Sequence, residues 1–266
     1  MKLRQLIKKT LALGLVSFLL RPISVDAQAA IKLLEVYPSD QAAFTQGLEL
    51  YGELEDNKLL MGTGLYGSSS IGLLDLEVGE YQVIDNLEEE YFGEGLTVTD
   101  DAIWQLTWKA GKAFRRNLDT FERLETVDYA GQGWGLAFDS DRQLLWMSDG
   151  SQLLSIRDQD SFELLGQLEV TYNEQTISNL NELEYANGLI FANIWLTEQI
   201  VAINPESGEI ENVYELSSLI ALVNQEFSQK QVEAMDVLNG IAHIEDNQFF
   251  ITGKHYPYVL KVELPR

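Results

Sequence analysis

A short segment that returns five times along the chain is the feature that most constrains the fold. Each copy places a glycine, or once a glutamate, before a leucine or isoleucine. The copies are Gln46-Gly47-Leu48, Glu94-Gly95-Leu96, Trp134-Gly135-Leu136, Asn181-Glu182-Leu183 and Asn239-Gly240-Ile241. Their starts are spaced by 48, 40, 47 and 58 residues. A motif that returns at such intervals is typical of repeat architectures, in which each copy is one supersecondary unit.

Further apolar runs follow each copy of the motif after a few polar turn residues. The second runs are 59–64, 103–108, 144–149, 189–195 and 249–254. A third run follows in most repeats, and stretches such as 162–170 indicate a fourth strand. Four short strands in about 40–50 residues make one propeller blade. The pattern therefore predicts an all-β fold, a five-bladed β-propeller, whereas a β-sandwich or generic strand patterning would not explain the recurring motif.

The longest interval, between the fourth and fifth copies, contains the segment 217–236. Its apolar residues Leu219, Ile220, Leu222 and Val223 precede a polar stretch. We interpret this segment as a short helical insertion before the last blade.

Residue counts exclude several kinds of active site. The chain of 266 residues has no cysteine, which rules out disulfides, thiolate nucleophiles and cysteine-ligated metals. The two histidines, His243 and His255, are too few for a three-histidine metal site. A Ser-His-Asp triad would have to use one of them, but we expect both to be structural.

The first residues are predicted to be an export signal. Lys2, Arg4, Lys8 and Lys9 form a basic start, an apolar run 11–20 follows, and Ala27-Gln28-Ala29 has the A-x-A pattern of a cleavage site. The run is shorter than the about 20 residues that span a bilayer, so a retained anchor is the weaker alternative. We therefore predict a signal peptide at 1–29, a propeller catalytic domain at 30–266, and a periplasmic or secreted location.

The predicted mature chain is strongly acidic. The formal charge of the whole chain is −24, and loss of residues 1–29 leaves 13 positive and 41 negative residues, a charge of −28. Such a surface repels nucleic acid and anionic lipid and attracts cationic peptides. Neither a nucleic-acid partner nor a stable membrane association is expected, and we expect a monomer.

Propeller geometry brings equivalent positions of the five repeats together around the central axis. The first such column holds Gln46, Glu94, Trp134, Asn181 and Asn239. About fourteen residues later, the second column is expected to hold Trp108, Ser148, Trp195 and Gly253, followed one residue on by Lys109, Asp149 and Lys254. Tryptophan walls around a few polar groups are the usual composition of a small-molecule site. A carboxylate among tryptophans, as expected for Glu94, would be desolvated and its pKa raised. Trp104 and Trp146 are assigned to core packing.

At these residues the sequence resembles the plant and bacterial glutaminyl cyclotransferase family. The resemblance runs in order from about Phe44 to the end of the chain. The segments that carry it are Phe44-Thr45-Gln46-Gly47-Leu48, Thr63-Gly64-Leu65-Tyr66-Gly67, Phe92-Gly93-Glu94-Gly95-Leu96-Thr97, Leu106-Thr107-Trp108-Lys109, Gly133-Trp134-Gly135-Leu136, Ser148-Asp149-Gly150-Ser151, Leu180-Asn181-Glu182-Leu183-Glu184, Ala192-Asn193 with Trp195, Val237-Leu238-Asn239-Gly240-Ile241-Ala242 and Thr252-Gly253-Lys254.

The resemblance implies an enzyme that converts the N-terminal glutamine of peptides to pyroglutamate with release of ammonia. It implies a five-bladed propeller whose funnel holds a site with no metal and no cofactor. The family's catalytic carboxylate matches Glu94, and its substrate-contacting residues match Phe44, Gln46, Trp108, Trp134, Asn181, Trp195 and Lys254. We expect Glu94, Lys254 and Asn181 to be catalytic and the others to bind substrate. The sequence departs from the family pattern at His255-Tyr256-Pro257, where Leu-Trp-Pro is expected, and this bears on the outer pocket.

Two other functions remain open on the residues alone. A propeller can serve as a scaffold that binds peptides or proteins without catalysis, but such a scaffold needs no converging Glu, Lys and Trp set. A metal-dependent hydrolase of the lactonase type would need several oxygen ligands around a calcium-type ion. Glu94, Asn181 and Asn239 supply part of such a set, while Trp and Lys occupy the remaining positions.

Overall fold

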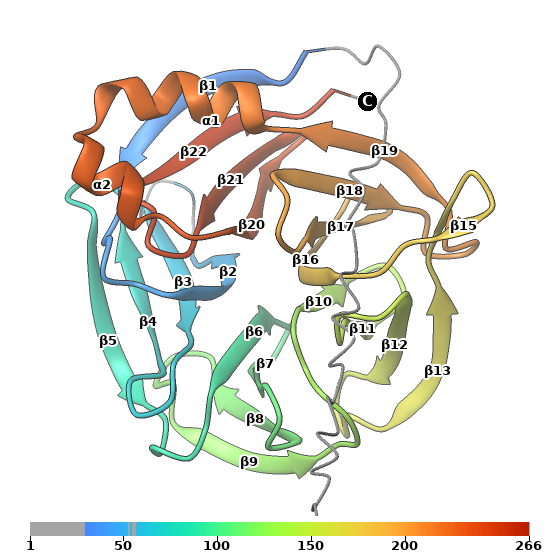
Figure 1. The fold of residues 1–266 in the computed structure, drawn as a ribbon. Helices are drawn as coiled ribbons and strands as arrows, with labels where there is room; N and C mark the ends of the chain where they lie inside the picture. Colours follow the sequence, from blue (N-terminus) through green and yellow to red (C-terminus); the bar gives the residue numbers. More distant parts are fainter. Residues whose placement is uncertain (1–29, 53, 55–56, 266) are drawn as a thin grey trace, which may run out of the picture.

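A computed structural model describes residues 30–52, 54 and 57–265 of the protein. The predicted signal peptide, residues 1–29, lies outside the described residues. Five four-stranded antiparallel sheets surround a central axis like blades, which confirms the predicted five-bladed propeller (Figure 1).

Each blade runs from an inner strand at the axis to an outer strand at the rim. The first blade consists of β2 (Thr45–Leu50), β3 (Lys58–Thr63), β4 (Ser70–Asp75) and β5 (Glu80–Asn86), and the second of β6 (Gly93–Val98), β7 (Ala102–Thr107), β8 (Lys112–Asn117) and β9 (Arg123–Asp128). The third consists of β10 (Leu136–Asp139), β11 (Leu144–Met147), β12 (Leu153–Asp158) and β13 (Leu164–Glu169). The fourth consists of β16 (Leu180–Ala186), β17 (Leu189–Ile194), β18 (Gln199–Ile203) and β19 (Ile210–Glu215). A small hairpin, β14 (Thr171–Tyr172) and β15 (Gln175–Thr176), joins the third blade to the fourth.

The fifth blade is built from both ends of the chain. Its three inner strands are β20 (Leu238–Glu245), β21 (Gln248–Gly253) and β22 (Tyr258–Glu263), and its outer strand is β1 (Lys32–Pro38). The pairing of β1 with β22 is antiparallel, with Val36 opposite Leu260. The five repeats did not indicate this closure, because β1 lies outside every copy of the motif.

The inner strands approach one another so closely that the motif glycines of the first three blades cannot carry a side chain, while in the fifth blade Gly240 has a φ of 125° that favours glycine. A Cβ atom on Gly47 would lie 2.6 Å from the backbone nitrogen of Leu96, and one on Gly135 would lie 2.1 Å from the carbonyl oxygen of Asn181. Such distances leave no room for a side chain. In the fourth blade, the equivalent position is Glu182, which is fully buried. Its carboxylate accepts hydrogen bonds from the backbone amides of Leu48, at 3.2 Å, and Ile241, at 2.8 Å.

Large apolar side chains fill the space between the blades. Trp104 and Trp146 are fully buried, as expected for core residues. The Trp104 indole donates a hydrogen bond to the carbonyl oxygen of Gln159 at 2.8 Å, and the Trp146 indole donates to the Asp139 carboxylate at 3.0 Å. These partners satisfy the one polar group of each ring, so the rings pack without an unpaired donor.

The segment before the last blade is helical, as predicted. It contains α1 (Ser217–Val223), the 3₁₀ turn η2 (Asn224–Glu226) and α2 (Gln229–Ala234). Ile220 and Val223 pack into the hydrophobic cluster that contains Tyr258, which holds this segment against the fifth blade (Figure 1). In the part of the chain that the structure describes, none of the helices has the length and apolar character required to cross a bilayer.

The close approach of the inner strands predicts a position-dependent effect of adding one methyl group. Gly135→Ala should destabilise the fold by about 1–3 kcal/mol or more, because the new Cβ overlaps the Asn181 carbonyl. Gly166→Ala, on the outer strand β13, should change stability by no more than about 0.5 kcal/mol, because its nearest neighbour would be the Ile156 Cδ1 atom at 3.7 Å. Urea unfolding of both variants measures the difference, and equal effects would contradict the packing argument.

Candidate active site

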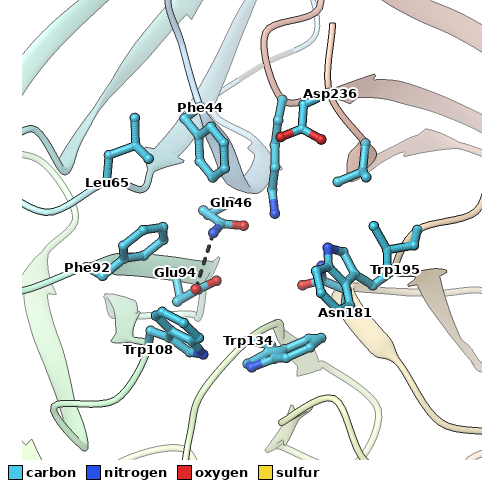
Figure 2. Close-up of a pocket in the computed structure, with 13 residues that line it drawn as sticks. Phe44, Gln46, Leu65, Phe92, Glu94, Trp108, Trp134, Asn181, Trp195 and Asp236 are labelled. Carbon is cyan, nitrogen blue, oxygen red and sulfur yellow. Dashed lines mark hydrogen bonds between the residues drawn. The ribbon is translucent and has the colours of Figure 1, made fainter. Parts of the chain in front are cut away.

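A pocket of about 350 Å³ opens at one end of the propeller axis. Its volume is typical of a small-molecule site. All eight of the predicted site residues line it, and Figure 2 shows the labelled ones converging from different blades. The lining residues are Phe44, Gln46, Leu65, Phe92, Glu94, Trp108, Trp134, Asn181, Trp195, Leu196, Asp236, Val237 and Lys254.

The second column of the repeat differs by one residue in the fifth blade from the sequence prediction. The amides of Trp108 and Lys254 make the same cross-strand hydrogen bond, to Phe92 and Val237 respectively, at 2.9 and 3.0 Å. Lys254, not Gly253, is therefore the equivalent of Trp108. The spacing is longer because β20 and β21 have a second register shift, between His243 and Glu245, which adds one residue to the hairpin.

Glu94 lies on the inner strand β6 at the floor of the pocket and is 5% exposed. Gln46 donates a hydrogen bond to its Oε1 atom at 3.2 Å (Figure 2). Burial raises the pKa of Glu94 well above its ordinary range, and the positive charge of Lys254 only partly opposes this effect. A carboxyl group in this state keeps its proton to a higher pH than an exposed glutamate does.

Lys254 extends into the pocket directly after β21 and is also 5% exposed. Its ammonium lies 5.0 Å from the centre of the Phe44 ring, and it makes no hydrogen bond or ion pair with another described side chain closer than 4 Å. Burial lowers the pKa of Lys254, whereas the negative charges of Glu94 and Asp236 raise it. The ammonium is thus held by its surroundings but has free donors for a bound molecule.

Aromatic rings form the walls of the pocket in two groups. Phe92 and Trp108 meet edge to face at 5.5 Å, and so do Trp134 and Trp195 at 5.4 Å. The side-chain oxygen of Gln132 joins the two groups by accepting hydrogen bonds from the Trp108 indole, at 2.7 Å, and the Trp134 indole, at 3.5 Å. Gln132 is exposed, and its role in orienting both rings was missed from the sequence.

Two residues of the columns, Asn239 and Ser148, do not line the pocket but support it through hydrogen bonds. Asn239 donates hydrogen bonds to the Gln46 side chain at 3.3 Å and to the Thr45 carbonyl oxygen at 3.1 Å. Ser148 donates to the Asn181 carbonyl oxygen at 2.7 Å and accepts from the Gly135 amide at 2.7 Å. These contacts fix the backbones from which Gln46 and Asn181 enter the pocket.

Five lining residues were not predicted from the sequence, although the repeat offered a signal for four of them. Phe92 and Val237 lie two residues before the first column, as Phe44 does. Leu65 and Leu196 directly follow the second column and adopt left-handed φ values of 89° and 65°. These φ values are uncommon for leucine. Asp236, the fifth, had no counterpart of the same charge in the other repeats.

Neither histidine lines the pocket, in line with the structural roles expected for both. The His255 ring packs edge to face on Phe44 at 5.3 Å, and its Nδ1 atom is 3.0 Å from the Gln41 carbonyl oxygen. His255 therefore supports a pocket wall from outside. Among residues 30–52, 54 and 57–265, no three His, Asp or Glu side chains are grouped so that they could hold a metal ion.

The sequence matches the model of the glutamine cyclotransferase family over residues 10–264. This match covers more than half of the chain, and the protein therefore belongs to that family.

The chain is similar in sequence to a glutaminyl-peptide cyclotransferase of Arabidopsis thaliana. The two are 34% identical over 246 residues, which are 91% of this chain and 74% of the relative.

Two solved structures resemble the fold. The glutaminyl cyclase of Myxococcus xanthus superposes with a TM-score of 0.76 and 31% identity, over 89% of this chain and 97% of the other. A protein of unknown function from Bacteroides thetaiotaomicron has a TM-score of 0.52 and 11% identity, over 90% and 72% of the two chains, which is a likeness of fold alone.

The burial of Glu94 predicts a pH-dependent stability. The folded protein holds the Glu94 proton above the unfolded-state pKa of about 4.3, because burial raises the folded-state pKa. This stability is fully present below the unfolded-state pKa and is lost as pH rises toward the folded-state pKa. Glu94→Gln cannot lose a proton, so its stability relative to wild type should rise from about pH 4 to about pH 8.

Urea midpoints of wild type, Glu94→Gln and Glu90→Gln at both pH values test this expectation. Glu90→Gln makes the same chemical change on an exposed loop and serves as the control. A constant difference between wild type and Glu94→Gln across this pH range would show that Glu94 does not carry the effect.

Proposed function

We propose that the protein is a metal-independent glutaminyl-peptide cyclotransferase, which closes the N-terminal glutamine of a peptide into pyroglutamate and releases ammonia. The observation that carries the proposal is the convergence of Glu94, Lys254 and Asn181 in one tryptophan-walled pocket, in a chain of the glutamine cyclotransferase family. A binding scaffold needs no buried carboxyl and ammonium groups of this kind, whose burial costs stability. Catalysis therefore explains the pocket better than a binding scaffold does.

The nucleophile of this reaction belongs to the substrate. The α-amine attacks the γ-carboxamide carbon of the same residue, a new C–N bond closes the ring, and the bond to the carboxamide nitrogen breaks. Proximity is built into the substrate, so the task of the pocket is to hold the folded-back conformer. Three indole rings, from Trp108, Trp134 and Trp195, supply flat apolar walls for that conformer. An α-amine has a pKa of about 7.7–8.0, and a neutral fraction is available near pH 7.

Departure of the carboxamide nitrogen requires a proton, because the amide anion is a very poor leaving group. Glu94 takes a proton from the attacking amine and delivers it to the departing nitrogen, which leaves as ammonia. The raised pKa of Glu94 suits this shuttle, since the same carboxyl must accept and donate a proton in one turnover. The hydrogen bond from Gln46 holds the Glu94 carboxyl in place.

Negative charge develops on the carboxamide oxygen during the attack. Lys254, whose ammonium has free donors in the pocket, stabilises this oxyanion together with Asn181. A well-placed donor in such a site contributes roughly 3–4 kcal/mol to transition-state stabilisation. The low polarity of the aromatic walls strengthens this interaction.

Ammonia release from a glutamine-initiated peptide tests the proposal. We expect turnover by wild type that persists in EDTA. Glu94→Gln should lower kcat by about 10²-fold to 10⁴-fold, because the proton shuttle is lost. Lys254→Met should lower kcat by about 10²-fold to 10³-fold, because the oxyanion loses its charged donor.

Glu90→Gln is the matched control for this assay, and its turnover should equal that of wild type. Near-normal turnover by Glu94→Gln would remove Glu94 from the mechanism. Turnover abolished by EDTA would favour the metal-dependent alternative. No turnover of any glutamine peptide would favour the scaffold.

Export of the protein as a monomer completes the proposal. The basic start, the short apolar run and the Ala27-Gln28-Ala29 segment support cleavage of a signal peptide. We expect the protein isolated from the periplasm or the medium to begin close to residue 28 or 30, as measured by intact mass. Recovery of the full-length chain with the membrane fraction would show instead that the apolar run is a retained anchor.

A further inference from the structure

We propose that the preferred substrates are peptides with lysine or arginine directly after the N-terminal glutamine, and that Asp236 binds this second side chain. The inference rests on the proposed function, since it names the substrate class of the same pocket.

The burial of the lining residues fixes which end of a peptide enters. Gln46, Glu94 and Asn181 are each 5% exposed or less, so the polar groups that can act on a carboxamide lie at the closed end. Leu65 and Leu196 are 39% and 50% exposed and line the open end. A glutamine residue held at the closed end must therefore send its chain out past the open end, where the second residue comes to lie.

Asp236 is an exposed carboxylate that lines the open end of the pocket. Its backbone amide donates to the Lys254 carbonyl oxygen at 2.9 Å, which fixes the position of the residue. Its carboxylate makes no hydrogen bond and no ion pair with any other described residue. Lys254 attracts it electrostatically but is itself buried, and the exposed Asp236 carboxylate is left to solvent or to a substrate.

Apolar groups beside this carboxylate favour a long basic side chain. Lysine and arginine carry three or four methylene groups before the charge, and such stems pack on apolar surface while the charged end stays in water. Val237, which follows Asp236 in the chain, and Leu196, which lines the same open end of the pocket, offer that surface. A short polar second residue would leave the apolar groups uncovered. An acidic second residue would face the negative charge of Asp236.

Opposite charges lie on opposite sides of the open end of the pocket. Figure 2 shows Asp236 across the pocket from Trp108. Lys109 lies against the Trp108 ring, with its ammonium 3.7 Å from the ring centre. A basic second residue near Asp236 is thus kept away from this lysine. The formal charge of −24 on the chain also draws cationic peptides toward the protein.

Three tripeptide amides that differ only in the second residue test the inference. They carry lysine, the uncharged norleucine, or glutamate after glutamine, and kcat/KM is measured by ammonia release in low salt. For wild type, we expect the lysine peptide to exceed the norleucine peptide by about twofold to fivefold, the range of an exposed ion pair, and the glutamate peptide to be the poorest. Added salt should reduce the preference, because it screens the interaction.

Asp236→Asn removes the charge with little change of shape, and the ratio of the lysine rate to the norleucine rate should fall to about one. Asp100→Asn, on an exposed turn between β6 and β7 at the other end of the blade, removes the same charge far from the pocket and should keep the ratio. A ratio that persists in Asp236→Asn overturns the inference. Equal loss for both peptides also overturns it, since Asp236 would then act through Lys254.

Turnover of all three peptides at equal rates by wild type would sink this inference and leave the proposed function intact. No turnover of any of them would instead overturn the proposed function, and the inference with it.

Discussion

The close approach of the five inner strands is the constraint on which the rest of the structure depends. Neighbouring inner strands all contact one another around the axis, and the Gly95 amide donates directly to the Trp134 carbonyl oxygen of the next blade at 2.7 Å. Close contacts exclude side chains at three of the five motif positions, and the φ of 125° at Gly240 favours glycine at a fourth, so backbone forms most of the ring. At the fifth, the Glu182 carboxylate bonds to backbone amides of two other blades and links them to its own. A ring held this way leaves little freedom to the residue preceding each motif position.

The chemistry of the pocket follows from that rigidity. Glu94 and Lys254 come from different blades and are both taken out of water, which costs each of them solvation. A flexible site would relax, and the two charges would move together or out to solvent. Here the Gly95 amide, directly after Glu94, bonds to the Trp134 carbonyl oxygen, and the Lys254 amide bonds to the Val237 carbonyl oxygen, so the backbones of both groups are fixed. Burial raises the pKa of Glu94 and lowers that of Lys254. Function is thus obtained at some expense of stability.

Much of the fold and of the site could be predicted from the sequence, because the repeat sets both the number of blades and the positions that meet at the axis. Five copies of one motif predict five blades, and the position preceding each glycine, or the glutamate that replaces it once, predicts Gln46, Glu94 and Asn181 at the pocket. The features that could not be predicted are those that do not recur from repeat to repeat. The pairing of β1 with β22 depends on residues that share no pattern with the motif. Lys254 was predicted to follow the second column instead of belonging to it, because the residue types do not reveal the additional register shift in its hairpin. Gln132 and Asp236 act through side chains that only one blade carries.

Pairing of the first strand with the last also sets the order in which the molecule can be completed. Lys32 and Glu263, which form an ion pair across this junction, are 231 positions apart in the chain. Closure over such a separation is slow, because the entropy of a very long loop must be lost before the contact forms. Without β22, β1 has no partner in the sheet, and the fifth blade cannot close the ring. The pairing of β1 with β22 is therefore the contact that turns the arc of blades into a circle.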